Sequence, residues 1–197
     1  SEIINFKLFK DTLPFDEIVE IKAGLQAYEK GKGEPKQSAE DVKKRPYDYL
    51  YKYDDDTHKY LEGGDVQRYS VGWSGQFLKY GKNLAAPRTI DLFNSKKIII
   101  REITGVFPHS IISTYSEDFY LYNRSNIGII PKKNSENNLL YILSVLNSKL
   151  IAYYFVKNTA KSVRKLFPKL ILNDLRKFPF KNISPEAQQP FILKADL

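Results

Sequence analysis

The hydrophobic period of the chain changes after Pro131, and this change constrains the fold more than any other feature of the sequence. Before it, short segments alternate apolar and polar side chains, the period of half-buried strands. After it, apolar residues recur every three or four positions, the period of an amphipathic helix. The helical pattern covers residues 136–156, with apolar Leu139, Ile142, Leu143, Leu146, Leu150 and Tyr153. We expect one face of this long helix to pack on a sheet.

The segments before Pro131 predict short strands separated by glycine, proline and asparagine. Such punctuation favours a curved mixed or antiparallel sheet, so the fold class is α+β. Residues 13–28 have a mixed period, which fits a short helix or strand leading into a loop at Gly24. The polar run 31–45 predicts an exposed loop. The predicted strands are 47–53, 66–71, 75–80, 96–104, 110–115, 118–122 and 126–130.

The last third of the chain contains two predicted helix starts. Ser135 lies in an N-cap position with Glu136 in the first turn, and Ser184-Pro185-Glu186 begins a C-terminal helix. We expect one domain over residues 1–183 and the start of a truncated helix over 184–197. The sequence begins at Ser1 and contains no methionine, which predicts a fragment or a trimmed chain. It shows neither an apolar run of membrane-spanning length nor a secretory signal, so we expect a cytoplasmic origin.

Charge is unevenly distributed along the chain. Residues 1–65 carry 11 Lys/Arg against 15 Asp/Glu, whereas residues 66–197 carry 20 against 8, a net charge of +12. Residues 157–181 alone reach +7, from eight Lys/Arg against one Asp. A field of this sign attracts polyanions, which makes nucleic acid the leading partner class. A basic surface that serves only solubility is the simpler alternative.

The sequence lacks the residues of several kinds of chemistry. Without cysteine there is no disulfide and no thiolate metal site, and His58 and His109 are too far apart to indicate zinc. No glycine-rich cofactor loop and no Asn/Asp-Pro-Pro-aromatic tetrad of a DNA methyltransferase is present. We expect no catalytic residue and no metal or cofactor site in this chain.

A group of two acidic residues and one lysine raises the hypothesis of a nuclease site. Asp16, Glu20 and Lys22 could hold a magnesium ion and a hydrolytic water. Their spacing is shorter than the strand-turn-strand separation expected for such a site. Acidic residues at a helix start also have an ordinary explanation in the helix dipole, which we prefer.

Several phrases occur in an order that resembles a known family. They are EGGDVQRYSVGWSGQFLKYG at 62–81, FNSKKIIIREITG at 93–105, DFYLYNRSNIGII at 118–130, LLYILSVLNSKLIAYYF at 139–155 and LILNDLRKFPFKNISPEAQQPFI at 170–192. Together they resemble the TaqI-like C-terminal specificity domain, or target recognition domain, of type IIG restriction-modification enzymes and N6-adenine DNA methyltransferases. More loosely they resemble the target recognition domains of type I specificity subunits. The resemblance spans residues 17–195 and is weakest over 29–60.

The resemblance implies a domain that grips double-stranded DNA and reads base edges. A methyltransferase domain of the same polypeptide would flip and methylate the target adenine, using S-adenosylmethionine, with Mg²⁺ added if the parent enzyme also cleaves. The implied partners are duplex DNA and that domain, with no membrane and no small-molecule substrate. Two alternatives remain: a protein-interaction or scaffold module whose basic face docks a sister domain or subunit, and a nuclease fragment using Asp16 and Glu20.

Arginine side chains in turns are the candidate readers of bases, because the guanidinium fork matches guanine. Arg101 lies in a strand; if Ile98 and Ile100 face the core, Arg101 projects from the opposite face toward either DNA or the neighbours of Glu102, and we favour DNA. Trp73 could stack on a base, although a lone tryptophan is more often a packing residue. The base-reading candidates are Arg68, Tyr69, Arg88, Arg101 and Arg124.

The densest basic cluster is the candidate phosphate clamp, with a solvated basic loop as its alternative. The richness in aromatic side chains, 14 Tyr and 12 Phe, also raises single-strand stacking as a hypothesis. Since most of these rings alternate along strands, packing in the core explains them more simply. The phosphate-binding candidates are Lys161, Arg164, Lys165 and Lys169.

Overall fold

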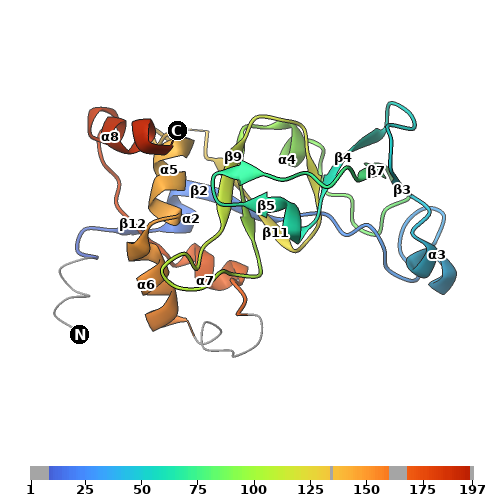
Figure 1. Cartoon of the computed structure of the whole chain (residues 1–197), viewed down its shortest axis with the longest axis horizontal. Helices are drawn as coiled ribbons and strands as arrows, with labels where there is room; N and C mark the ends of the chain where they lie inside the picture. Colours follow the sequence, from blue (N-terminus) through green and yellow to red (C-terminus); the bar gives the residue numbers. More distant parts are fainter. Residues whose placement is uncertain (1–8, 134, 160–167, 196–197) are drawn as a thin grey trace.

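A four-stranded antiparallel sheet, called the central sheet below, divides the molecule (Figure 1). The structure is a computed structural model that describes residues 9–133, 135–159 and 168–195. Neighbouring strands pair in the order β2-β11-β8-β9. Their bounds are β2 Val19–Ala23, β11 Asn126–Pro131, β8 Lys97–Arg101 and β9 Ser113–Ser116.

A second four-stranded sheet follows the order β10-β4-β7-β3, with β10 and β4 parallel and the other pairs antiparallel. The fold is therefore α+β with both mixed and antiparallel sheets, as the sequence predicts. The second sheet contains β10 Leu121–Tyr122, β4 Thr57–Leu61, β7 Phe77–Lys79 and β3 Asp48–Tyr49. Two further antiparallel pairs join β1 Leu13–Pro14 to β12 Pro179–Phe180, and β5 Val66–Gln67 to β6 Ser70–Val71.

Helices gather mainly on one side of the central sheet, and the second sheet lies on the other (Figure 1). On the helical side are α2 Phe15–Ile18, α5 Leu139–Leu146, α6 Lys149–Asn158, α7 Leu172–Arg176 and α8 Pro185–Ala195. On the side of the second sheet are α3 Ala39–Lys44, α4 Asp91–Asn94 and the 3₁₀ turn Gly63–Asp65.

Both faces of the central sheet are buried, each by its own hydrophobic core. Along β8, Ile98 and Ile100 belong to the core shared with the helices, whereas Ile99 belongs to the core shared with the second sheet. Gly128 on β11 makes room for the second core, because a Cβ there would collide with the hydroxyl group of Tyr122. A strand buried on both faces reads as a continuous apolar run, which explains the three consecutive isoleucines Ile98, Ile99 and Ile100 in β8.

The single helix predicted over 136–156 is two helices. The first, α5, begins at Leu139 with the side chain of Asn138 as its N-cap instead of Ser135. The second, α6, begins after Ser148, whose hydroxyl oxygen accepts a hydrogen bond from the amide of Ile151 at 3.2 Å. The break exists because Asn147 and Ser148 cap and bend the chain, and the helices meet at 56°.

This bent pair has the combined length and apolar composition of a membrane-spanning segment. Within residues 9–133, 135–159 and 168–195, no single helix is long and apolar enough to cross a bilayer. Only α5 and α6 taken together meet the criteria of length and composition.

Other local predictions were partly wrong. The segment 47–53 is a strand only at Asp48–Tyr49; beyond it the ring of Tyr53 stacks on that of Tyr49, with centroids 4.9 Å apart. The polar run 31–45 is not entirely loop, since it contains α3, which Ser38 and Asp41 cap reciprocally. Residues 66–71 form the hairpin β5–β6 instead of one strand. The predicted C-terminal helix from Pro185 is confirmed as α8.

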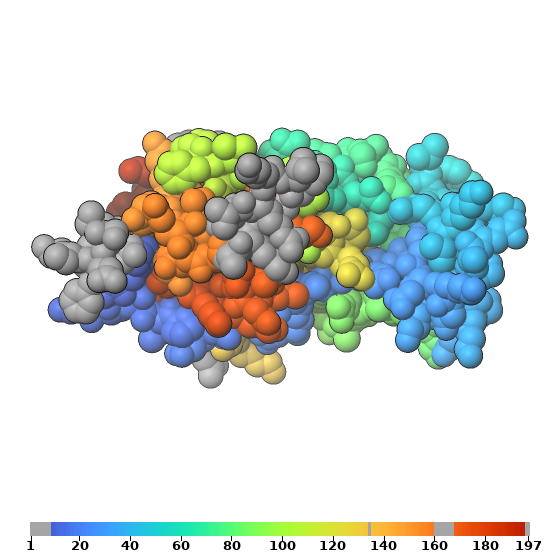
Figure 2. All heavy atoms as spheres, turned by 90° about the horizontal axis from the view of Figure 1, so that it is seen from below, coloured from blue at the N-terminus to red at the C-terminus, as the bar shows by residue number. Residues whose placement is uncertain are grey.

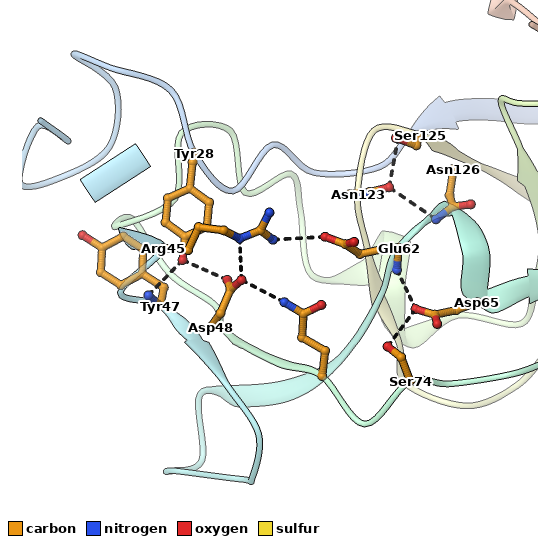
Figure 3. Close-up of polar contacts among 11 residues, drawn as sticks. Tyr28, Arg45, Tyr47, Asp48, Glu62, Asp65, Ser74, Asn123, Ser125 and Asn126 are labelled. Atoms are coloured by element: carbon orange, nitrogen blue, oxygen red, sulfur yellow. Dashed lines mark hydrogen bonds and ion pairs between the residues drawn. The ribbon is translucent and has the colours of Figure 1, made fainter. Parts of the chain in front are cut away.

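A polar network ties the segment around α3 to the second sheet (Figure 3). The hydroxyl of Tyr28 donates to Asp48 at 2.9 Å, and Asp48 also accepts from Arg45 at 2.6 Å and from Gln76 at 2.8 Å. Arg45 reaches Glu62 at 3.1 Å. Burial and the neighbouring Asp48 carboxylate raise the pKa of Tyr28. These contacts fix the residues where the family resemblance is weakest.

Candidate nucleic-acid interface

The five base-reading candidates lie around one end of the central sheet, which we call the cationic end. This end is formed by the last residues of β2 and β8 and the first residues of β11 and β9. Antiparallel pairing brings them together: Ala23 faces Ile127, Asn126 faces Arg101, and Ile100 faces Ser113. The candidates enter it from β8 itself and from three separate turns.

Arg101 is the last residue of β8, at the rim of the sheet. Among the described residues its guanidinium group contacts no hydrogen-bond acceptor, while its backbone amide donates to Ile112 at 3.0 Å. Ile98 and Ile100 face the helical core, whereas Ile99, on the same face as Arg101, is fully buried in the second core. The second core therefore covers most of this face, and Arg101 lies half-buried at its edge.

Arg124 lies on the turn between β10 and β11, beside Arg101. Its Nη1 donates to Oε1 of Gln26 at 2.9 Å, and the backbone oxygen of Ser125 accepts from Glu102 at 2.7 Å. The side chain of Asn123 braces the turn by accepting from the amide of Ser125 at 3.1 Å (Figure 3). The sequence placed Arg124 in a turn, and the structure confirms that setting.

Arg88 borders the β2 side of the cationic end. Its backbone is left-handed, with φ 65°, and is held by a 2.6 Å hydrogen bond from Tyr80 to its carbonyl oxygen. Its Nε donates to the carbonyl oxygen of Gly24 at 3.3 Å. Beside it lies a hollow of about 550 Å³, to which Lys22 and Arg176 also contribute. Three cationic side chains therefore surround one depression at the edge of the sheet.

Arg68 and Tyr69 form the turn of the β5–β6 hairpin at the β9 side. Arg68 is engaged within the protein: its Nη1 lies 2.8 Å from Nδ1 of His109, and its Nη2 donates to the carbonyl oxygen of Asn147 at 2.9 Å. Tyr69 is 44% exposed, has φ 65°, and its amide donates to Ser113 at 3.0 Å. Arg68 thus holds the hairpin against the sheet, while the ring of Tyr69 faces solvent.

Of the four phosphate-binding candidates, only Lys169 falls within the described residues; Lys161, Arg164 and Lys165 lie outside them. Lys169 Nζ is 3.2 Å from a carboxylate oxygen of Glu102, directly after β8. The clamp candidate is therefore attached to the cationic end, although its charge is partly compensated there.

Figure 2 looks onto this part of the surface. The yellow turn between β10 and β11 lies right of the centre and the orange-red segment of α7 lies to its left, whereas the yellow-green loop after β8 lies further left beside the orange α6. The surface is thus built from segments that are far apart in the sequence.

Trp73 is a packing residue. Its indole Nε1 donates to the carbonyl oxygen of Gln76 at 2.8 Å, and its ring packs edge-on against Phe77, with centroids 5.0 Å apart. It lies against the second core, with Lys59 Nζ 4.9 Å from its centroid. The satisfied N–H agrees with the packing interpretation.

The acidic constellation of the nuclease hypothesis is divided between two elements. Asp16 lies in α2, whereas Glu20 lies on β2 and pairs with Lys22 at 2.7 Å. This contact lowers the pKa of Glu20. Within the described ranges, no three His, Cys, Asp or Glu side chains gather as a metal-ligand set.

The sequence did not single out the loop between β8 and β9, nor Lys22 and Arg176 as neighbours of Arg88. A usable signal for the loop was the apolar pair Val106–Phe107, which stands between Gly105 and Pro108 outside any alternating strand pattern. No local signal joins Lys22, Arg88 and Arg176, because three separate segments bring them together.

Comparison with known proteins gives three matches. Residues 58–180 match the TaqI-like C-terminal specificity domain. A putative type II restriction enzyme and methyltransferase of Methanocaldococcus jannaschii is 29% identical over 122 residues, which cover 61% of this chain and 10% of that protein. The crystal structure of the HsdS subunit from Thermoanaerobacter tengcongensis aligns with a TM-score of 0.52 at 11% identity, covering 93% of this chain and 36% of that chain.

These matches differ in what they cover. The chain spans about a tenth of the length of the curated relative and about a third of the solved subunit. The likeness to the solved subunit shows a shared fold across nearly the whole of this chain.

Proposed function

Because the chain belongs to the TaqI-like C-terminal specificity domain family, we propose that it reads the sequence of double-stranded DNA through the cationic end of its central sheet. As a specificity domain of a restriction-modification system, it supplies recognition, and the reaction belongs to another part of the parent protein. We further propose that this part is a methyltransferase domain of the same polypeptide, to which the present chain presents a target adenine.

The gathering of the arginine candidates at one end of the sheet carries this proposal. Four strands spaced by about 4.8 Å span roughly 14 Å, close to the ~12 Å width of the DNA major groove. Arg101 and Arg124 stand at the two inner strands, β8 and β11, whereas Arg88 and Tyr69 flank the outer strands. Inner positions suit base edges, and outer positions suit the two phosphate backbones.

This arrangement gives each candidate a role. Arg101 and Arg124 read bases, because they lie in the middle of the cationic end. Arg88 and Tyr69 contact the backbone or outer base edges. Arg68 supports the hairpin through His109 and Asn147. Lys169 and the three preceding basic residues Lys161, Arg164 and Lys165 bind phosphates.

A selection of random duplexes at low salt tests the recognition proposal. The chain should enrich one motif of several base pairs, and an Arg101→Ala/Arg124→Ala variant should lose base preference at defined positions within it. Lys43→Ala, an exposed substitution on α3, is the matched control and should enrich the wild-type motif. Equal retention of every duplex would contradict specific reading and favour a basic face that docks a sister domain or subunit.

The methyltransferase part of the proposal is supported by the M. jannaschii relative, which is described as a putative type II restriction enzyme and methyltransferase. The test uses the full-length parent protein with labelled S-adenosylmethionine and the selected duplex. Label should enter one adenine of the motif, and a duplex carrying N6-methyladenine there should take up none. Label in cytosine, or in duplexes without the motif, would contradict the proposal. If the parent also cleaves, cutting of the same duplex should require Mg²⁺.

A further inference from the structure

The loop between β8 and β9, residues 102–112, leaves the cationic end and exposes an apolar tip beside α6 (Figure 2). The side chain of Val106 is 85% exposed and that of Phe107 is 53% exposed. Both belong to the connection that begins immediately after Arg101. Large apolar side chains that protrude together from a soluble domain commonly mark a surface that another molecule covers.

The tip stands on a firmly closed base. The amide of Gly105 donates to the carbonyl oxygen of Ser110 at 2.8 Å, and the amide of His109 donates to that of Val106 at 2.8 Å. A Cβ at Gly105 would lie 2.5 Å from the carbonyl oxygen of His109, so only glycine allows this closure. Below the tip, Ser110 and Ile111 are buried. The loop therefore presents the apolar pair on a closed turn.

A second set of bonds fixes the start of the loop to the segment before α7. The amide of Thr104 donates to the carbonyl oxygen of Pro168 at 3.0 Å, and the amide of Leu170 donates to that of Glu102 at 2.7 Å. Lys169, between them, pairs with Glu102. The loop and the basic segment are thus joined along several residues.

Cations surround the base of the tip. Arg68 binds His109 within the loop, Arg101 precedes it, and Lys169 is bonded beside its start. An apolar projection within a basic surface suits a partner that is anionic outside and apolar inside. Duplex DNA has this composition, because its phosphates enclose stacked bases, and apolar wedges of Phe, Leu, Ile, Met or Pro enter base steps in several DNA-binding proteins.

We propose that Val106 and Phe107 form an apolar wedge that inserts between base pairs of the bound duplex and unstacks one step. This inference rests on the proposed recognition of duplex DNA and adds a distortion of that DNA. The phosphate contacts of the cationic end hold the duplex against the tip, and burial of the Phe107 ring compensates the lost stacking.

The experiment places 2-aminopurine, a base whose fluorescence is quenched by stacking, at successive positions of the selected duplex. Wild-type protein should raise the fluorescence at one step. A Val106→Ala/Phe107→Ala variant should abolish this rise and weaken binding about tenfold or more, the effect of exposing roughly one large apolar side chain. Leu50→Ala is the matched control, because Leu50 is 86% exposed on the turn after β3, outside the cationic end, and should leave both signals unchanged.

Thermal unfolding of the double variant should match that of the wild type, since both side chains lie at the surface. Specific binding without a fluorescence rise at any position would overturn the wedge and leave the recognition proposal standing. A rise that persists in the double variant would also overturn it. Failure of the wild-type chain to retain any duplex at low salt would overturn both proposals.

Discussion

The side chain of Asn147 binds the backbone of Ser113 as a neighbouring strand would. Its Oδ1 accepts from the amide of Ser113 at 3.2 Å and from the hydroxyl at 2.8 Å, while its Nδ2 donates to the carbonyl oxygen at 3.0 Å. Both residues are buried, at 3% and 0% exposure. Asn147 is also the residue at which α5 ends. One amide therefore breaks the helix and attaches it to the edge strand β9.

Removing this amide should destabilise the fold. Asn147→Ala leaves the buried amide of Ser113 without an acceptor, which should lower the free energy of unfolding by about 2–3 kcal/mol. Urea denaturation measures the change. Asn158→Ala is the control, because that exposed side chain donates, among the described residues, to its own helix at Tyr154 and should change stability by less than about 0.5 kcal/mol. Equal stability of the two variants would show that the Asn147 contact is unimportant.

The two inner arginines should behave as base readers. Arg101→Ala and Arg124→Ala should each weaken binding to the preferred duplex by about 1–3 kcal/mol and relax the preference at one position. Binding to unrelated duplexes should change little. Competition titrations with single base-pair substitutions measure both effects. A loss of the same size on every duplex would instead assign that arginine to the phosphate backbone.

The basic cluster should set the salt dependence of binding. Replacing Lys161, Arg164 and Lys165 by alanine should weaken binding to all duplexes alike and reduce the slope of log K against log salt by roughly 3, about 0.9 per contact. Adding Lys169→Ala should reduce it by less, because Glu102 already pairs with that side chain. Fluorescence anisotropy between low and moderate salt gives the slopes. An unchanged slope in the triple variant would remove these residues from the phosphate interface.

Lys97 should make stability depend on pH. Its buried Nζ donates to the carbonyl oxygens of Asp118 at 2.7 Å and Ser95 at 3.0 Å, and burial lowers its pKa to about 8. Between pH 8 and 9.5 the unfolded chain still binds this proton while the folded protein releases it. The contribution of Lys97 to the free energy of unfolding therefore rises with pH in that window, by roughly 1–2 kcal/mol.

The measurement is chemical denaturation at several pH values for the wild type and for Lys97→Met. The unfolding free energy of the wild type should increase relative to that of Lys97→Met as the pH rises from 8 to 9.5. Above this window, ionising tyrosines of the unfolded chain act in the opposite direction, because burial raises the pKa of Tyr60 and Tyr122. A difference that is constant across the window would contradict the lowered pKa of Lys97.

Much of the local structure follows from the sequence. The short strand-like segments between turn residues predicted β7, β8, β9 and β11, and Ser184-Pro185 predicted the start of α8. These elements follow from periodicity and from end signals, which are properties of neighbouring residues. The ordered phrases also carried the family resemblance, and the charge asymmetry pointed to a polyanion.

Long-range contacts determine the features that the local sequence pattern could not predict. The helix pattern over 136–156 is continuous in sequence, yet it breaks at Asn147 because that side chain bonds to Ser113, 34 residues away. Arg68 and Arg124 look alike in sequence, but only the folded chain places Arg68 between His109 and Asn147. The role of each arginine depends on such partners, and periodicity holds no information about them.

The sequence by itself determined the α+β class, most of the strands, the basic character of the second half and the set of arginines worth testing. Only the tertiary structure decided that those arginines share one end of one sheet, from which the loop that carries the exposed pair Val106 and Phe107 departs. The physical reason is the antiparallel pairing of β2, β11, β8 and β9, which places turns from distant segments beside one another. Hydrogen bonds between strands assemble that surface, and the local sequence pattern contains no signal for it.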